Sequence, residues 1–536
     1  MTTALDAVLA YHQRSKHQFQ RYAAGPDGMD WNSQPDPFRT YAGSPQLELP
    51  LLDGSAGPGY AELYRQPGFE PQPLNLNNLA ALLQLSFGVS AWKQYDETRW
   101  ALRCNPSSGN LHPTEAYVVA QGCAGLVDGV HHYVSRDNLL EQRCCFADGE
   151  RALPTDTFVL GLTSIHWREA WKYGERAFRY CQHDVGHAIA AVRYAAATLG
   201  WTVKLLNHWS DAEIGQVLGI DRSEDYAQAE KEHPDILLQV SLQTVVETVA
   251  PEKLLRAAGA GVWPGQANTL SVRHMHDWPA IDEVAAACAK PETQESTWQA
   301  PKLPAPLNSP CARSAREIIQ QRRSAQSFDG IGSISRSVFF RMLDLTLPRP
   351  GIPPWDEIPW APRIDLVLFV HRVDGLEPGL YLFLRNAQRE DTLRSLFRQD
   401  FEWERVADCP AHLPLFRLVA ADMRDAARAL SCHQEIAADG AFSLGMLAEY
   451  EASLALGPWV YRQLFWEAGM LGQVLYLEAE AAGVRGTGIG CFFDDGVHEA
   501  LGLQGKRMQS LYHFTVGVPL TDNRLQTLSA YGHLKR

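Results

Sequence analysis

The chain has 536 residues, of which 46% are hydrophobic, 10% aromatic and 21% charged. This composition is typical of globular proteins with a large core, and it excludes a disordered, collagenous or small disulfide-stapled chain. The 48 Lys and Arg residues against 62 Asp and Glu residues give a net charge of −14, which argues against nucleic acid or an anionic membrane as a partner.

Helix and strand patterns follow one another along the chain without regular βαβ alternation, which favours an α+β protein. β-branched and aromatic residues predict strands, and apolar runs that reach a glycine near their end predict helices. The predicted strands are Pro113–Ala120, Ile236–Gln243, Arg363–Val373 and Leu511–Val518, and the predicted helices are Gly186–Trp201 and Gly472–Val484.

The opening residues and the cysteines indicate the cellular compartment of the protein. The opening stretch, MTTALDAVLAYHQRSKHQ, lacks a basic segment followed by a long apolar run, so we predict a cytoplasmic protein. The apolar run Ala188–Leu199 is too short to span a membrane and is interrupted by Arg193. The ten cysteines form no CxxC pair, which predicts reduced thiols rather than a zinc ribbon or a thioredoxin-like motif.

The chain contains an internal repeat. Gly186–Ile220 aligns without a gap with Gly469–Leu503, and GLVDGVHHY at Gly125–Tyr133 aligns with GLEPGLYLF at Gly375–Phe383. A Pro-rich stretch, Pro291–Pro310, separates the two copies. We therefore predict one domain over residues 1–288, a linker over residues 289–311 and a second domain over residues 312–536. The first alignment places Gly186, Gly200 and Gly219 on Gly469, Gly483 and Gly502.

Several segments resemble the FMN-dependent nitroreductase superfamily, and specifically its SagB-type dehydrogenase branch. They are RCNPSSGNLHP at Arg103–Pro113, RRSAQSF at Arg322–Phe328 and GTGIG at Gly486–Gly490, with further similarity over Tyr11–Gly43 and Trp171–His187. The resemblance implies two tandem nitroreductase-like domains, each a mixed and mainly antiparallel sheet flanked by helices. It also implies that the two domains form an intramolecular pseudo-dimer.

The resemblance implies an FMN cofactor, and the residue types suit one. Arg322, Arg323 and Ser324 offer cationic and hydroxyl donors for its phosphate. The loop with Pro106, Ser107, Ser108 and Asn110 offers polar groups for the flavin ring, and Gly488, Ile489 and Gly490 permit close backbone approach. Arg524 is a further candidate phosphate contact, whereas Gln326 stands where the family usually has a basic residue.

Family dimers build each flavin site from both protomers, and the two halves of this chain have lost complementary parts. In the first half, the counterparts of Arg322–Ser324 and Gly488–Gly490 are Leu63–Arg65 and Leu205–Asn207. In the second half, the counterpart of Pro106–Asn110 is Trp355–Pro359. We therefore expect one intact FMN site per chain, with the second site inactive or filled by protein.

Lys172 and Tyr173 match a Lys-Tyr pair that is linked to catalysis in SagB-type azoline dehydrogenases. This similarity implies oxidation of a thiazoline- or oxazoline-like group, or a related C–C or C–N bond, in a small-molecule or peptide-derived substrate. The alternatives are an NAD(P)H-dependent nitroreductase-type reductase and a flavin-binding pseudoenzyme or scaffold. NAD(P)H or O2 is the candidate redox partner, and the pseudo-dimer needs no second chain to complete its site.

One motif permits a different class of site. His183-Asp-Val-Gly-His187 matches a pattern in which two histidines on one helix face bind zinc. Asp184 is a shorter base than the usual Glu, Gly186 weakens the helix, and no clear third ligand follows. We therefore predict no metal.

Overall fold

The two halves form two antiparallel sheets of seven strands, and six strands of each sheet follow the same order. The computed structural model describes residues 3–534 except 53, 55, 67, 148, 150 and 243–246. The first sheet runs in the order β2 (Gln46–Glu48), β7 (Leu139–Cys145), β6 (Gly129–Val134), β5 (Thr114–Ala120), β8 (Thr157–Ser164), β10 (His233–Ser241) and β9 (Thr202–Leu205). The second runs β16 (Glu404–Arg405), β17 (Leu415–Ala420), β15 (Gly379–Phe383), β13 (Ile364–Val370), β18 (Phe442–Glu449), β20 (Met508–Gly517) and β19 (Arg485–Ile489). The predicted α+β class with duplicated, mainly antiparallel sheets is confirmed.

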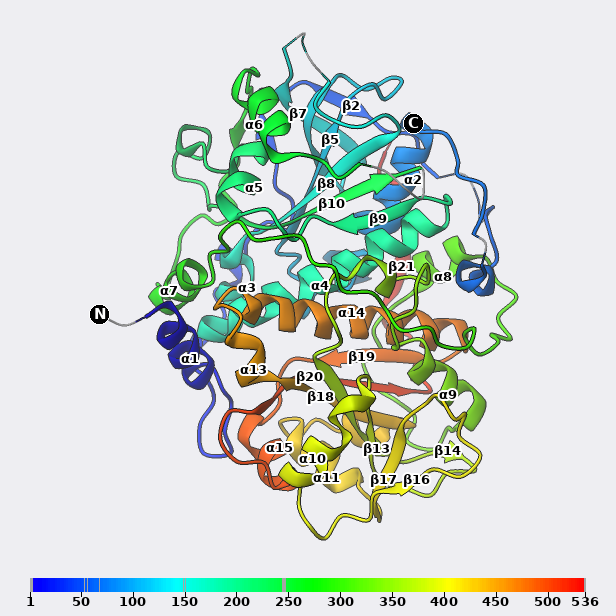
Figure 1. Cartoon of the computed structure of the whole chain (residues 1–536). Coiled ribbons are helices and arrows are strands. Elements are labelled where there is room, and N and C mark those ends of the chain that lie inside the picture. The colour runs from blue at the N-terminus through cyan, green and yellow to red at the C-terminus, as the bar shows by residue number, and fades with distance from the viewer. Residues whose placement is uncertain are drawn as a thin grey trace.

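Two long helices lie between the sheets. Figure 1 shows α4 (Ala177–Ala197) and α14 (Val460–Ala481) side by side in the middle of the molecule, with the first sheet above them and the second below. Every residue of α4 is buried, including its polar ones, because it packs on the first half and on α14. The core is therefore continuous across the junction of the two halves.

The predicted strands and helices are present with shifted ends. Pro113–Ala120 corresponds to β5 apart from Pro113, and Leu511–Val518 lies in β20 apart from Val518. Ile236–Gln243 lies in β10 apart from Leu242, while Gln243 is outside the described residues. Arg363–Val373 is divided, because β13 ends at Val370 and Val373 begins the short strand β14 (Val373–Asp374), which pairs with β12 (Ile334–Ser335). The predicted helices cover only the C-terminal parts of α4 and α14. Their N-terminal parts carry buried polar side chains that hide the apolar pattern.

Both ends of the described chain pack on the opposite half. The first helix, α1 (Ala4–Arg14), brings His12 to Tyr461 and Gln509 of the second half, at 3.2 and 3.0 Å. The last strand, β21 (Gln526–Leu528), pairs with β3 (Val89–Tyr95) of the first half, which also pairs with β4 (Thr98–Arg103). The two halves are thus interlocked through their ends as well as through α4 and α14.

The remaining helices flank the sheets, and no helix or strand lies between α7 (Pro279–Ala287) and α8 (Ala315–Gln321), where a linker is predicted. Among the described residues, no helix is long and apolar enough to cross a membrane. The other helices are α2 (Leu76–Phe87), α3 (His166–Tyr173), α5 (Asp211–Leu218), α6 (Pro251–Gly259), α9 (Arg336–Asp344), α10 (Glu390–Leu396), α11 (Arg424–Leu430), α12 (Ile436–Asp439), α13 (Tyr450–Leu454) and α15 (Asp494–Leu501), and β1 (Tyr41–Ala42) pairs with β11 (Gln266–Ala267).

Candidate active site

A cavity of about 530 Å³ lies between the two halves. Its volume is within the range of roughly 300–1,000 Å³ that is usual for ligand pockets. The first half contributes the loop Asn105–Asn110, and the second half contributes Arg322–Ser324 and Thr487–Cys491. Three segments that are far apart in the sequence therefore meet around one space.

The serine-containing loop joins β4 to β5 and has an unusual backbone. Gly109, Asn110 and His112 have φ angles of +59°, +61° and +54°, and the last two are non-glycine residues in the left-handed region. The Asn110 side chain holds this shape, because its Nδ2 donates to the Ala101 carbonyl at 2.9 Å and its Oδ1 lies 3.0 Å from His112 Nε2. Strained backbone of this kind is concentrated at functional sites.

Asp184 of α4 also holds this loop in place. Its carboxylate is 1% exposed and accepts hydrogen bonds from the backbone N–H and the hydroxyl of Ser108, both at 3.0 Å. Burial raises the pKa of Asp184 to about 7, against the lowering effect of its bonds to Ser107 and Ser108. The Ser108 hydroxyl thus bonds to Asp184 and does not extend into the cavity as a free donor.

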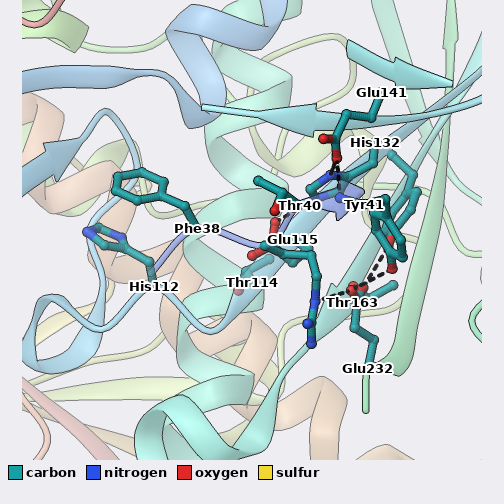
Figure 2. A network of polar contacts seen from close by, with 12 residues as sticks. Phe38, Thr40, Tyr41, His112, Thr114, Glu115, His132, Glu141, Thr163 and Glu232 are labelled. Atoms are coloured by element: carbon teal, nitrogen blue, oxygen red, sulfur yellow. Dashed lines mark hydrogen bonds and ion pairs between the residues drawn. The ribbon is translucent and has the colours of Figure 1, made fainter. Parts of the chain in front are cut away.

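A buried polar network supports the strand that follows the loop (Figure 2). His132 lies between Glu115 and Glu141, with nitrogen–oxygen distances of 2.9 and 3.3 Å. Arg168 pairs with Glu115 and also donates to the His112 carbonyl at 2.8 Å. The network connects the end of the loop to the interior of the first sheet and so limits its movement.

One end of the cavity is strongly positive. Lys93, Arg322, Arg323 and Arg485 all line it, and the guanidinium groups of Arg322 and Arg323 donate to backbone carbonyls and not to carboxylates. Burial and the charges of Arg323 and Arg485 lower the pKa of Lys93, and burial beside Arg322 lowers the pKa of Arg323 to about 10. Cations held this close to one another favour an anion such as a phosphate.

The glycine segment forms another wall, where a tyrosine links two of the predicted elements. The Tyr476 hydroxyl accepts from the Gly488 N–H at 2.9 Å and lies 2.9 Å from the Ser324 hydroxyl. A β-carbon at Gly488 would overlap the Tyr512 hydroxyl, and one at Gly490 would overlap the Tyr180 ring. Glycine is therefore required at both positions for close packing against aromatic side chains.

Tyr173 and Lys172 lie differently with respect to the cavity. Tyr173 lines it, and a β-carbon at Gly109 would be only 2.5 Å from the Tyr173 hydroxyl oxygen. Lys172 does not line the cavity, and its Nζ lies 5.2 Å from the centre of the Tyr173 ring. Burial, followed by the charge of Glu169, raises the pKa of Tyr173 well above its usual value, so its hydroxyl stays protonated.

A buried carboxyl lies behind this pair. Glu169 of α3 is fully buried, and neither of its oxygens has a hydrogen-bond partner among the described residues. Burial and the charge of Asp184 raise the pKa of Glu169 well above its usual value. The surroundings of this carboxyl therefore favour its protonated form.

The structure brings together most of the predicted binding residues. Pro106, Ser107, Ser108, Asn110, Arg322, Arg323, Ser324, Gly488, Ile489, Gly490 and Tyr173 line the cavity. Arg524 is not among the lining residues, because its side chain is 73% exposed and pairs with Asp522 at 2.8 Å.

Lys93 and Arg485 line the cavity but are not among the predicted binding residues. Arg485 directly precedes the GTGIG motif, so the motif could have indicated it. Nothing near Lys93 in the sequence indicates that its strand reaches this cavity.

His183 and His187 have structural partners. The His183 ring stacks on Tyr512 with ring centres 4.1 Å apart, and His187 Nε2 lies 3.2 Å from the Tyr512 hydroxyl. Among the described residues, no group of three or more His, Cys, Asp or Glu side chains could hold a metal ion. Asp184, the candidate base of a zinc site, instead anchors Ser108.

Comparison with known proteins identifies the fold and its sequence relatives. No protein-family model matches the chain. A Methanocaldococcus jannaschii protein named for the nitroreductases is 27% identical over 177 residues, which are 31% of this chain and 81% of that protein. The crystal structure of an Anabaena variabilis protein with the same kind of name aligns at a TM-score of 0.68 and 22% identity over 96% of this chain and 99% of its own. The chain is thus similar in sequence to one protein of this name over part of its length, and it shares its fold with the other over nearly all of it.

The nitroreductase fold is thus shared over the whole two-sheet arrangement and not only over one half. A chain of the E. coli microcin synthetase McbBCD complex with truncated pro-MccB17 also aligns, over 46% of this chain and 94% of its own, at 16% identity. The TM-score of this alignment is 0.27.

The segments that correspond to a second site in the internal repeat are packed with protein. Trp355, in the counterpart of the serine loop, is 2% exposed and donates from Nε1 to the Leu345 carbonyl at 2.8 Å. The next residue, Asp356, pairs with Arg193 of α4 at 2.7 Å. Leu206, in the counterpart of the glycine segment, is fully buried. One flavin site per chain remains a prediction that this packing favours.

Proposed function

We propose that the chain is an FMN-dependent oxidoreductase with one flavin site, in the cavity between its two nitroreductase-like halves. The observation that carries the proposal is the meeting of Pro106–Asn110 with Arg322–Ser324 and Gly488–Gly490 around one space. Either half alone lacks part of this set. The duplication thus supplies both sides of the site within a single chain.

The positive end of the cavity suits the FMN phosphate. Lys93, Arg322, Arg323 and Arg485 provide the charge, and the Ser324 hydroxyl is an additional donor. Asp522, the carboxylate of the lining, is already paired with Arg524. Arg485 lies 4.0 Å from a Glu480 oxygen, whereas Lys93, Arg322 and Arg323 bond to carbonyl or hydroxyl oxygens, so a dianionic phosphate would find an excess of cations.

The opposite part of the cavity suits a flavin ring and a substrate. The loop at Pro106–Gly109 is held rigid by Asp184, and Tyr180 and Tyr512 pack against the glycine segment. FMN, when bound, supplies a two-electron acceptor or donor. Rigid walls and buried aromatic groups keep water from a reacting centre and fix the orientation of what binds there.

We further propose that the reaction is a SagB-type dehydrogenation of a thiazoline- or oxazoline-like group. Tyr173, which stays protonated, donates a hydrogen bond to a heteroatom of the substrate from beside Gly109. Lys172, one residue before it and outside the cavity lining, is the proposed acceptor of the proton that leaves the substrate carbon, which requires its side chain to turn toward the cavity. The second hydrogen leaves the substrate as a hydride, which carries both electrons and for which bound FMN would be the acceptor.

The visible absorption spectrum of the purified protein tests the proposal. We expect flavin bands at a stoichiometry close to one per chain when FMN is saturating, and a stoichiometry of two would overturn the single-site arrangement. Anaerobic bleaching of these bands by a thiazoline-containing peptide, and not by NADPH, supports the dehydrogenase. Bleaching by NADPH, with reoxidation by a nitroaromatic, would make the chain a reductase. Bound flavin that neither compound reduces would identify a pseudoenzyme.

A further inference from the structure

Two cysteines from distant parts of the second half meet beside the cavity. Cys491 directly follows Gly490 and lines the cavity, and Cys432 lies in the loop between α11 and α12. Both are half-buried, and their side chains are hydrogen-bonded to each other. Figure 1 places α11 next to α15, the helix that begins just after Cys491.

The backbone holds the two thiols in place. Phe493 N–H donates to the Leu430 carbonyl at 2.9 Å, and Gln434 Nε2 donates to the Cys491 carbonyl at 3.0 Å. Cys432 has a φ angle of +53°, in the left-handed region that side chains such as cysteine rarely occupy. Strain of this kind persists only where the surrounding contacts fix the loop, and here those contacts come from the segment that carries Cys491.

Basic groups surround Cys491. His17 Nδ1 accepts from the Ala23 N–H at 2.9 Å, which leaves its other nitrogen as the donor to the Cys491 thiol. The Arg176 guanidinium donates to the Gly490 carbonyl at 3.0 Å. The Cys432 hydrogen bond lowers the pKa of Cys491, helped by His17 and Arg176, whereas the bond to Cys491 and burial raise the pKa of Cys432.

Other cysteines lie in different surroundings. Burial raises the pKa of Cys104 and Cys123 to about 11, and of Cys288 to about 12. Cys409 is half-buried like the pair, yet burial raises its pKa to about 11 as well. Cys409 thus provides a thiol of similar exposure whose pKa no neighbouring thiol lowers, and the charge of Arg405 does not offset the effect of burial.

We propose that Cys432 and Cys491 form a redox-active pair that closes to a disulfide by exchange with a small-molecule disulfide. The Cys491 thiolate attacks one sulfur of that disulfide, which forms a mixed disulfide and releases one external thiolate. Cys432 then loses its proton and attacks the Cys491 sulfur, which closes the internal disulfide and releases the second thiolate. Two protein thiols are oxidised, and one external disulfide is reduced to two thiols.

Thiol mapping of the full-length protein in glutathione mixtures tests this exchange, whether or not flavin is bound. After acid quenching and alkylation of free thiols, we expect a linked Cys432–Cys491 peptide pair whose yield follows the ratio of oxidised to reduced glutathione. Dithiothreitol should reverse the link. If both residues remain alkylated at high oxidised glutathione, or if either pairs with a different cysteine, the proposal is overturned.

Single substitutions separate the two steps. Cys432→Ser should stop the reaction at the mixed disulfide, so that Cys491 retains one glutathione. Cys491→Ser should leave Cys432 free at the same concentration. In the wild-type protein, Cys491 should react at least tenfold faster than Cys409, and Cys409→Ser should leave the link unchanged. Equal reaction rates of the Cys491 and Cys409 thiols would refute Cys491 as the site of exchange. This comparison uses the wild-type protein, so it does not depend on whether a variant folds.

Discussion

Gly186 of α4 and Gly469 of α14 touch at the point where the two central helices cross. A β-carbon at Gly469 would lie 2.9 Å from the Cα atom of Gly186, and one at Gly186 would lie 2.8 Å from the Cα atom of Trp466. The two glycines are also equivalent positions of the internal repeat. The crossing therefore joins the halves symmetrically, as an interface between two identical subunits would.

Substitution at this crossing should destabilise the junction. We expect Gly469→Ala to lower the free energy of unfolding by about 1–3 kcal/mol, because the added methyl group overpacks a helix contact that cannot open locally. Denaturant unfolding followed by circular dichroism measures this change. Gly259→Ala is the matched control, since Gly259 ends α6 and a β-carbon there meets nothing within 4 Å. Equal midpoints for the two variants would contradict the expected close contact.

Features that depend on single residues are predictable from this sequence. The other two aligned glycine pairs, Gly200 with Gly483 and Gly219 with Gly502, all have positive φ angles, from +68° to +78°. A backbone with positive φ favours glycine whatever the neighbouring residues are. The repeat can therefore be recognised from these glycines although the rest of the sequence has diverged.

Features that depend on the meeting of distant segments are not predictable in this way. Lys93 enters the cavity on a strand that pairs with β21 from the other end of the chain, and Cys432 meets Cys491 only through the packing of two loops. Arg524 is the opposite case, a residue that the sequence suggests for the site but that the fold places outside it. Its type suits a phosphate, but Asp522 lies two residues away and pairs with it at the surface.

Two arginines should differ in their effect on flavin binding. We expect Arg323→Gln to weaken FMN binding about ten- to hundredfold, because a hydrogen bond to a charged group contributes about 1.5–3 kcal/mol. Arg524→Gln, the control, should change affinity less than twofold, since Arg524 lies outside the cavity lining. Fluorescence titration of FMN onto the flavin-free proteins measures both. Unfolding midpoints without FMN show whether Arg323 acts on binding or on folding.

The His132 network should make stability depend on pH. Burial lowers the pKa of His132, but its bonds to Glu115 and Glu141 outweigh burial and raise it from 6.5 to about 9. The charged ring therefore stabilises the fold fully below pH 6.5, and this contribution, on the order of 3 kcal/mol, is lost as pH rises through 9.

Chemical unfolding at pH 6 and at pH 9.5 tests this dependence. The wild-type protein should lose more stability between the two values than His132→Gln does. His371→Gln should keep the wild-type dependence, because burial lowers the pKa of His371 to about 4, below this range. Parallel losses in the wild-type and His132→Gln proteins would show that His132 is neutral throughout.

Lys172→Ala should leave FMN bound but lower turnover at least tenfold, since the proposed proton acceptor is removed while the cavity lining is unchanged. Flavin content and steady-state turnover are measured on the same preparation. Lys302→Ala, an exposed lysine in the linker, serves as the control. Unchanged turnover would reject Lys172 as the proton acceptor.

Tyr173→Phe should slow substrate-driven flavin reduction about a hundredfold at unchanged flavin content. The variant removes only the hydroxyl, which is the part of the side chain that lies beside Gly109 in the cavity wall. Stopped-flow absorption under anaerobic conditions isolates this step from reoxidation. Tyr381→Phe is the matched control, because the Tyr381 hydroxyl bonds to the Glu377 carbonyl in the sheet of the second half. If both variants reduce flavin at the wild-type rate, the Tyr173 hydroxyl does not contact the substrate, and the packing of its ring against Tyr180 is its main role.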